Sequence, residues 1–548
     1  MRKRQLLALL FAALTIGARL PFLISGKIPF DSDEAVEGLM ARHVLNGELP
    51  AFFWGQAFKG VPEVYLSAGA FALLGSSVAV LKAVTLALFA TYVGANFVLL
   101  DKIASRWVAA AASLLLIAAP PALIFWSLDA SAEYVVIMLL GTTLVLLTSA
   151  GTAPTGVSRA EGKEQREQKA RLLAIGLVTG LGLWVHQLFV VYLIPLGIIL
   201  SLRSEWWKRR RPATLNRFVL GLGAIAAIYF VLGIVAFLTG GFVLQIGSLA
   251  ISATAPQKMA RIAVGILALA AFVQVATTAG GSMLRDTVRR YWIAAAGFLI
   301  GYSPVLLYSA LVEPARSPAR VATLQHLIAA APDILGNIIP ILAGFKIATT
   351  EQLPLPVVAV IPGAAALAAY LWTSRHSLVF NFFALFVVFF PLLFLASGAY
   401  LDTQSYRYFV PWYAGLSVAW AVGSYALAGV VRLKPGTANY RPVIASALVA
   451  AIVGVHVWQQ VIWYRKLQPD TQSLATIDCL RRNGIRGGYA EYWTAYKLTF
   501  LAQERIVVAP TDGIDRYPKY TEYVRALPAH ERVHLRADTT DCPDARSR

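Results

Sequence analysis

Three carboxylates stand within four residues near the start of the chain, at Asp31, Asp33 and Glu34. Acids this close repel one another, so their pKa values rise unless a cation lies near them. A carboxylate of raised pKa can accept the proton of an attacking hydroxyl as a general base. Alternatively, Asp31 and Asp33 could bind a divalent cation such as Mg²⁺ or Mn²⁺, or the acids could cap the following helix from a solvated turn. The residues alone leave these interpretations open.

Arg407 is the best candidate for binding a phosphate. It precedes a late apolar run and has Tyr406 beside it. A guanidinium suits a phosphodiester because it donates two parallel hydrogen bonds. Arg19 lies inside the first apolar run, where a charge is costly, so we expect it to pair with a carboxylate or a phosphate. The alternatives are an interfacial anchor in an aromatic belt for Arg407 and a snorkelling side chain for Arg19.

Six more polar residues are candidates for contacting a substrate from neighbouring segments. One is a second cation, three are carboxylates, and the last two form a polar pair in the middle of an apolar stretch, where polar side chains are costly and often functional. The alternatives are helix capping for the acids and a structural hydrogen bond for the histidine. The six residues are Lys59, Glu63, Asp129, Glu133, His186 and Gln187.

The composition decides what kind of protein must position these side chains. Of 548 residues, 58% are hydrophobic and only 14% are charged, and the mean hydropathy is +0.63. Soluble proteins carry about 25% charged residues, and disordered chains have low hydrophobicity. Both classes are therefore excluded for most of the chain. Residues 1–463 are predicted to form an all-α polytopic membrane domain, and residues 464–548 a small soluble α/β domain.

About thirteen membrane-spanning helices of roughly 20 residues each account for the apolar runs. The run 172–202 has basic residues at both ends and is too long for one ordinary helix. We therefore expect two helices there, with a turn near His186 and Gln187. The first run follows three basic residues and has no cleavage site, which predicts an uncleaved signal anchor with its N-terminus inside. The other runs are 78–100, 107–126, 132–150, 217–239, 259–279, 291–311, 354–373, 377–397, 408–431 and 442–463.

The net charge of +19 follows from this topology. Loops on the cytoplasmic side of a membrane collect Lys and Arg, and no zinc-finger or RNA-binding signature points to a nucleic-acid partner. The predicted outside loops, at 25–77, 127–131, 240–258, 312–353 and 398–407, hold 8 Lys and Arg. The predicted inside loops hold 23, in the ranges 1–5, 101–106, 151–171, 203–217, 281–290, 374–376 and 432–441. This excess of Lys and Arg in the inside loops places the tail, after residue 463, outside the cytoplasm.

Three predicted outside segments are more than connections. One is the loop 312–353, which Pro314, Pro318, Pro332 and Pro340 break. The long loop 25–77 is rich in acids, and the apolar spacing of Val36, Met40 and Val44 predicts a surface helix over 33–45. The tail alternates helical pieces at 471–482 and 492–501 with strand-like pieces at 488–490 and 505–510. Its two cysteines, Cys479 and Cys542, could form a disulfide in an oxidising compartment.

The order of residues after the first apolar run resembles a known family of membrane enzymes. An Asp-Glu pair lies in Pro-Phe-Asp-Ser-Asp-Glu-Ala at 29–35, followed by Ala-Arg at 41–42, Gly-Gln at 55–56 and a Tyr-to-Gly stretch at 65–75. This resembles the glycosyltransferase C (GT-C) superfamily, and within it the branch of protein O-mannosyltransferases and the lipid A aminoarabinose transferase. Many relatives have Lys-Pro-Pro-Leu where this chain has 60–63, with Lys59 shifted by one.

The resemblance implies a glycosyltransferase that takes a hexosyl or pentosyl group from a polyprenyl-phosphate donor. Asp33 matches the family's catalytic base, and Glu34 would orient or tune it. Acceptors in such families are lipids, glycans or proteins. A bacterial inner membrane, with the active site and the tail facing the periplasm, fits the compact loops. The resemblance implies no cofactor, although the acids leave a divalent cation open. The alternatives are a transporter or flippase of lipid-linked sugars and a non-catalytic assembly partner.

Overall fold

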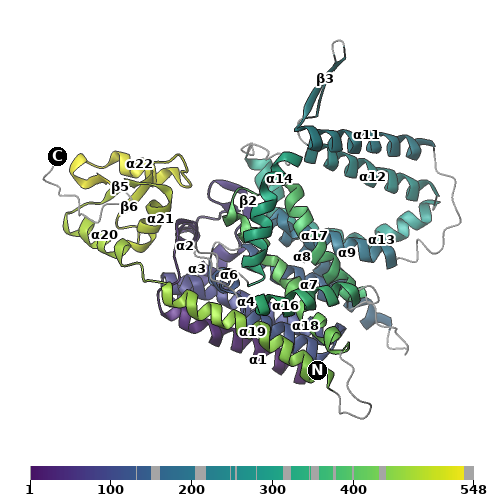
Figure 1. Ribbon diagram of the computed structural model, residues 1–548. Coiled ribbons are helices and arrows are strands. Elements are labelled where there is room, and N and C mark those ends of the chain that lie inside the picture. Colours follow the sequence, from purple (N-terminus) through teal and green to yellow (C-terminus); the bar gives the residue numbers. More distant parts are fainter. Residues whose placement is uncertain are drawn as a thin grey trace.

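The chain folds into a long bundle of apolar helices in a computed structural model (Figure 1). Six of the helices among the described residues are long and apolar enough to cross a membrane, so the chain is an integral membrane protein. The described residues are 2–130, 133–149, 161–203, 217–246, 249–253, 256–278, 280–312, 323–344, 346, 357–373, 378–397, 400–430 and 440–535.

The helices coincide with the apolar runs of the sequence. They are α1 (Arg2–Ile24), α4 (Val78–Ile103), α5 (Arg106–Ile117), α6 (Pro121–Trp126), α7 (Glu133–Ser149), α8 (Glu161–Val185), α9 (Val190–Arg203), α11 (Arg217–Thr239), α12 (Pro256–Thr278), α13 (Gly280–Leu311), α16 (Val357–Thr373), α17 (Leu378–Ser397), α18 (Tyr413–Ala428) and α19 (Arg441–Lys466). The run 172–202 divides as predicted, because α8 ends at Val185 and α9 begins at Val190, after the short helix η2 (Gln187–Phe189).

Several predicted loops contain regular structure. The prediction of an inside loop at 281–290 is wrong, since α13 continues through these residues. The run 107–126 is broken between α5 and α6, where the Pro120-Pro121 pair cannot continue a helix. The outside loop 240–258 holds an antiparallel hairpin of β3 (Phe242–Ile246) and β4 (Leu249–Ala253). The loop 312–353 holds α14 (Leu324–Asp333), the π-turn η3 (Ile334–Ile338) and α15 (Ile339–Leu342).

The acid-rich first loop forms a compact unit. It contains α2 (Ser32–Leu45), β1 (Phe52–Phe53) antiparallel to β2 (Gln56–Gly60), and α3 (Pro62–Leu74). The helix predicted over 33–45 is confirmed, but its apolar side chains do not lie on a free surface. Val36, Leu39 and Met40 are fully buried against α3 and against α21 (Tyr492–Leu501) of the tail. Burial of these apolar groups is what fixes α2 in place.

The tail forms a small parallel sheet with helices around it. We call residues 467–535 the C-terminal segment. The sheet has strand order β6 (Val507–Pro510), β5 (Gly487–Ala490), β7 (Arg532–His534), and both pairings are parallel. The helices are α20 (Thr471–Arg482), α21 and α22 (Pro518–Ala526), with the short η6 (Ala529–Glu531) before β7. Cys479 is buried and disulfide-bonded. Cys542 lies outside the described residues.

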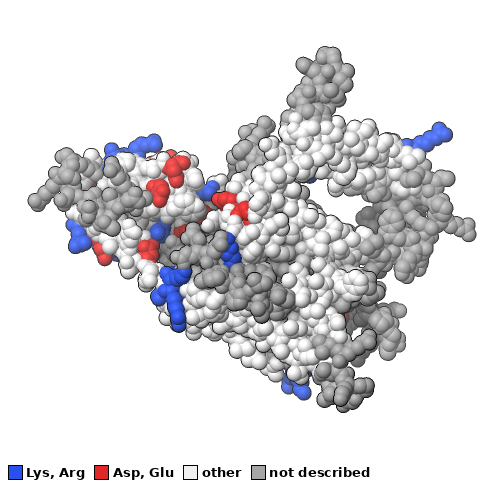
Figure 2. All heavy atoms as spheres, viewed as in Figure 1, with Lys and Arg blue, Asp and Glu red and all other residues white. Residues whose placement is uncertain are grey.

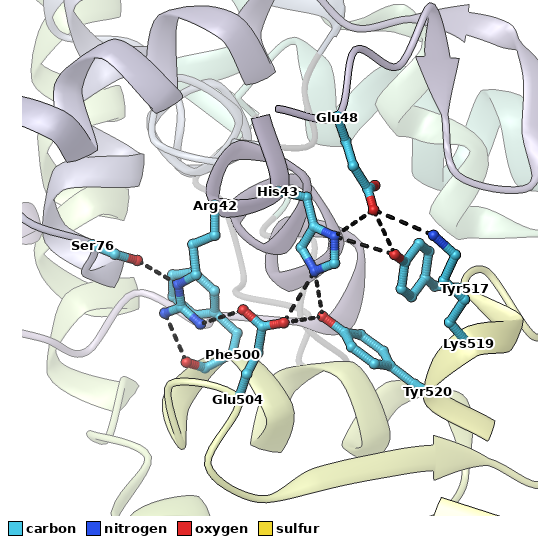
Figure 3. A network of polar contacts seen from close by, with 9 residues as sticks. All are labelled: Arg42, His43, Glu48, Ser76, Phe500, Glu504, Tyr517, Lys519 and Tyr520. Atoms are coloured by element: carbon cyan, nitrogen blue, oxygen red, sulfur yellow. Dashed lines mark hydrogen bonds and ion pairs between the residues drawn. The ribbon is translucent and has the colours of Figure 1, made fainter. Parts of the chain in front are cut away.

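A polar network joins α2 to the C-terminal segment (Figure 3). His43 lies between two carboxylates: Nδ1 is 3.2 Å from Glu48 and Nε2 is 3.1 Å from Glu504. Tyr517 donates to Glu48 at 2.8 Å, and Tyr520 donates to Glu504 at 2.6 Å. Burial lowers the pKa of His43, but its hydrogen bonds to the two carboxylates outweigh burial, and the net change is a rise. The two parts of the chain are therefore locked by charged hydrogen bonds.

The two ends of the bundle differ in character. The C-terminal segment adjoins α2 at the end of the bundle opposite the N-terminus (Figure 1). In Figure 2 many of the visible charged side chains gather over the C-terminal segment, whereas the visible flank of the bundle is largely free of them. The ends of α1 and α19 meet on the same side, where Phe22 stacks on Trp463 at 5.7 Å. The first loop and the tail therefore share one end of the bundle.

Candidate functional site

The acidic motif forms the first turn of α2. Asp31 is the N-cap residue, and its Oδ1 accepts a hydrogen bond from the Glu34 amide at 3.0 Å. Asp33 and Glu34 follow in the first turn, where the helix dipole stabilises negative charge. The capping interpretation of the motif therefore holds for Asp31. It does not exclude chemistry, because the three side chains have different surroundings.

Glu34 is fully buried and paired with a lysine that the sequence analysis missed. Lys82 of α4 donates to both carboxylate oxygens of Glu34, at 2.6 and 2.7 Å, and to the Pro29 carbonyl at 3.0 Å. The Ala130 amide donates to Glu34 at 2.9 Å. Burial raises the pKa of Glu34 well above its ordinary value, although Lys82 opposes the rise. The pair ties α2, α4 and the loop before α7 together.

Lys59 is surrounded by carboxylates. Its Nζ is 3.2 Å from Glu133 and 3.5 Å from Glu37, and all three side chains are buried. Burial lowers the pKa of Lys59, but Glu133 and Glu37 outweigh burial and raise it overall. Burial raises the pKa of Glu37 to about 8. Glu63 accepts a hydrogen bond from Thr85. This cluster lies beside the acidic motif, and Lys59 neutralises acids there.

A cavity of about 470 Å³ opens where the first loop, the late loop and the C-terminal segment meet. Asp31 contributes to its wall, and so do Tyr406 and Arg407 of η5 (Thr403–Trp412). Three tryptophans from three different elements complete the aromatic part of the lining: Trp126, Trp463 and Trp493. Asp402 is a second carboxylate in the lining, so the cavity combines acids, a guanidinium and aromatic rings, and it can bind a ligand with both charged and apolar faces.

Arg407 carries its charge at this cavity. Burial lowers its pKa, whereas Tyr134, Tyr408 and Asp33 raise it, and the net change is a rise. Its guanidinium carbon lies 5.3 Å from the centre of the Tyr408 ring. Arg407, the predicted phosphate ligand, and Tyr406, the substrate-binding candidate beside it, thus both line the cavity.

Asp31 and Asp33 have different partners. Burial raises the pKa of Asp31 to about 7, and the nearby charges of Asp129 and Asp33 add to the rise. Asp33 accepts a hydrogen bond from the hydroxyl of Tyr492, in the C-terminal segment. Asp129 is buried next to Asp31 and Glu34, since it raises the pKa of both. The structure thus brings the acids of the two loops together.

Three of the predicted residues lie elsewhere or play structural roles. Arg19 is fully buried and donates to Ser127 Oγ at 2.6 Å and to the carbonyls of Leu116 and Ile117 at 3.0 and 3.2 Å. It satisfies the C-terminal end of α5 rather than a carboxylate or a phosphate. His186 caps η2 by accepting from the Leu188 amide at 3.0 Å.

His186 also forms a β-bridge with Lys59, so it borders the carboxylate cluster. Gln187 is exposed. Neither residue lines the cavity. Among the described residues, no group of three or more His, Cys, Asp or Glu side chains is arranged to hold a metal ion.

No family model and no curated protein matches the sequence. Solved structures match in three dimensions. The archaeal oligosaccharyltransferase AglB from Archaeoglobus fulgidus, in complex with an inhibitory peptide and a dolichol-phosphate, is 12% identical with a TM-score of 0.51, over 93% of this chain and 64% of that one. The apo form of the oligosaccharyltransferase from that organism is also 12% identical with a TM-score of 0.51, over 93% of this chain and 65% of that one.

The chain has the GT-C fold. The likeness covers nearly the whole of this chain, which spans less than two thirds of the length of the oligosaccharyltransferase. ArnT from Cupriavidus metallidurans, bound to undecaprenyl phosphate, is 10% identical with a TM-score of 0.47, over 94% of this chain and 87% of that one. The sequence resemblance to GT-C enzymes, which is specific over roughly residues 15–80, agrees with the fold shown by the comparison with the oligosaccharyltransferase.

Proposed function

We propose that this GT-C chain is a membrane glycosyltransferase that transfers a sugar from a polyprenyl-phosphate donor to an acceptor hydroxyl. One observation carries the proposal: Asp31 and Arg407, which lie far apart in the sequence, line the same cavity at one end of an apolar bundle. Asp33, the proposed base, follows Asp31 in the first turn of α2 and lies next to this lining rather than in it. A phosphate diester needs a cation, and an attacking hydroxyl needs a base beside it. The solved AglB structure is a complex with a dolichol-phosphate, which is a donor of this chemical class without its sugar.

The reaction assigns a role to each group. The acceptor oxygen forms a bond to C1 of the sugar while the bond from C1 to the phosphate oxygen breaks. Asp33 accepts the hydroxyl proton, and polyprenyl phosphate leaves with the bonding electrons. Arg407 stabilises the negative charge of that phosphate. Such a single displacement inverts the configuration at C1.

Asp31 is assigned to substrate binding. Its carboxyl faces the cavity and its pKa is raised to about 7 by burial first and by neighbouring acids second. A carboxyl that is partly protonated near neutral pH can both donate and accept hydrogen bonds with sugar hydroxyls. Glu34, held by Lys82, fixes the first turn of α2 rather than reaching the cavity. The base and the binding acid are thus separate residues on one turn.

The remaining assignments extend this proposal. About thirteen spans and an extracytoplasmic C-terminal segment agree with the distribution of Lys and Arg among the loops. A bacterial inner membrane is proposed from the compact loops. The aromatic wall formed by Trp126, Trp463 and Trp493 suits a sugar face. The acceptor is a lipid, a glycan or a protein hydroxyl. A transporter of lipid-linked sugars is the alternative function, and it requires no base.

Binding of polyprenyl phosphate to purified protein in nanodiscs tests the phosphate site. Replacement of Arg407 by Gln should weaken binding at least tenfold, because a charge-assisted pair is lost. Arg441→Gln is the matched control, since that arginine is exposed at the start of α19 and lies outside the cavity lining. Equal affinities of wild type and both variants would contradict the proposed site.

A further inference from the structure

We propose that Tyr492, in the C-terminal segment, is a positioning residue for Asp33, so that this segment completes the active site. The inference rests on the proposed function, because it assumes that Asp33 is the base. It adds a residue from 459 positions further along the chain. The tail then contributes to the reaction itself rather than only covering the bundle.

The contact between the two residues is direct. The Tyr492 hydroxyl donates a hydrogen bond to Oδ1 of Asp33. Arg516 lies behind it, with its Nε donating to the same hydroxyl at 3.4 Å. A donor on one carboxylate oxygen holds the plane of the carboxylate in one orientation. A general base needs both a fixed orientation and a free lone pair, and Oδ2 remains for the acceptor proton.

The backbone of Tyr492 is itself held by hydrogen bonds at its carbonyl and at its amide. Its carbonyl accepts from Ser32 Oγ at 2.6 Å, and its amide donates to Asp512 Oδ2 at 3.0 Å. Ser32 Oγ accepts in turn from the Lys497 amide at 3.2 Å. Ser32 is the residue directly before Asp33, so the first turns of α2 and α21 are joined at the acidic motif. The ring of Tyr492 is fully buried.

Close packing between α2 and α21 keeps this register. A Cβ atom added at Gly38 would come within 2.4 Å of the Phe500 ring, so a glycine is required at this crossing. Trp493, next to Tyr492, lines the cavity together with Asp31. Two consecutive residues of α21 therefore reach the site in different ways: Tyr492 contacts the base, and Trp493 forms part of the wall.

Several charged groups surround Asp33. Glu34 of the same turn is paired with Lys82 of α4 and lies near Asp129. Asp31 stands beside Asp33 on the same turn, and the electrostatic effect of Asp33 also reaches cations on two other elements. These neighbours are Asp31, Lys59 of β2, Arg407 of η5, Tyr492 of α21 and, behind it, Arg516.

The test compares Tyr492→Phe with wild type in the release of polyprenyl phosphate from a labelled polyprenyl-phosphate sugar, using the full chain in nanodiscs. Without the hydroxyl donor the carboxylate loses its fixed orientation, so the reaction step should suffer more than donor binding. The kcat at neutral pH should fall about tenfold or more, with the KM for the donor little changed. A role in packing alone would lower stability and leave the kcat of the folded protein unchanged.

Tyr496→Phe is the matched control. Tyr496 lies one turn further along α21, is equally buried, and directs its hydroxyl to Asp515 within the C-terminal segment. Tyr496→Phe should lower the melting temperature without lowering the kcat of the folded protein. If Tyr492→Phe behaves like Tyr496→Phe while Asp33→Asn is inactive, the positioning role is refuted and the proposed function stands. If Asp33→Asn is fully active, the proposed function itself fails.

Discussion

The buried ion pair between Glu34 and Lys82 should hold the site together, and breaking it should lower the free energy of unfolding by a measurable amount. Lys82 contacts both carboxylate oxygens at 2.6 and 2.7 Å, and the two side chains are 0% and 4% exposed. Removing one partner of a buried pair leaves an uncompensated charge, which costs about 3–5 kcal/mol. Lys82→Met and Glu34→Gln should each lower the free energy of unfolding by that amount. The double variant should recover most of it, because no charge is then left alone.

A double-mutant cycle measures this coupling. The free energy of unfolding would be followed by tryptophan fluorescence in mixed micelles for wild type, both single variants and the double variant. The matched control is the exposed pair of Arg486 and Glu531, which lie 3.3 Å apart with side chains 59% and 22% exposed. Arg486→Gln should cost less than about 1 kcal/mol. Small, additive losses at Glu34 and Lys82 would refute the reasoning.

Three further results are expected at the elements around the site. The pKa of His43 is raised in the folded protein. Its contribution to the stability of the contact between α2 and the C-terminal segment is therefore complete below about pH 6.5, and it is lost as the pH rises through the raised pKa. Proteolysis between α19 and α20 should therefore become faster above neutral pH, and His43→Asn should remove that dependence. Gly38→Ala should speed the same cleavage at every pH, because its methyl group would overlap Phe500. Arg19→Met should lower the melting temperature by leaving two α5 carbonyls without the hydrogen bonds that Arg19 donates, with polyprenyl phosphate binding unchanged in the protein that remains folded. Unchanged proteolysis, or a selective loss of binding by Arg19→Met, would contradict these assignments.

Much of the fold could be predicted from local patterns. Hydrophobic runs located the helices, and the polar pair at 186–187 located a helix break. The helices Thr471–Arg482 and Tyr492–Leu501 end where capping signals and turns predict. The loop 281–290 was mistaken because basic residues alone do not end a helix. Helix α14 was missed because the prolines of the segment 312–353 suggested an irregular loop.

The site was predicted only in part, since its parts come from distant segments. Arg407 and Asp31 could be selected by residue type, and they do share a cavity. Lys82 was missed although a single lysine near the start of an apolar helix is a recognisable signal of a buried partner. Tyr492 could not be selected, because an aromatic cluster usually packs in a core. Its hydroxyl meets Asp33 only through the docking of two distant helices.

The central claim is that Asp33 accepts the proton in a sugar transfer. Purified wild type, Asp33→Asn and Asp31→Asn would each receive labelled polyprenyl-phosphate sugars with membrane extract as acceptor, and released polyprenyl phosphate would be followed. Wild type should release it, and well-folded Asp33→Asn should be slower by roughly 10²–10⁴-fold. Asp31→Asn should mainly raise KM. Wild-type rates for Asp33→Asn, or loss of turnover only in Asp31→Asn, would contradict the assignment of the base.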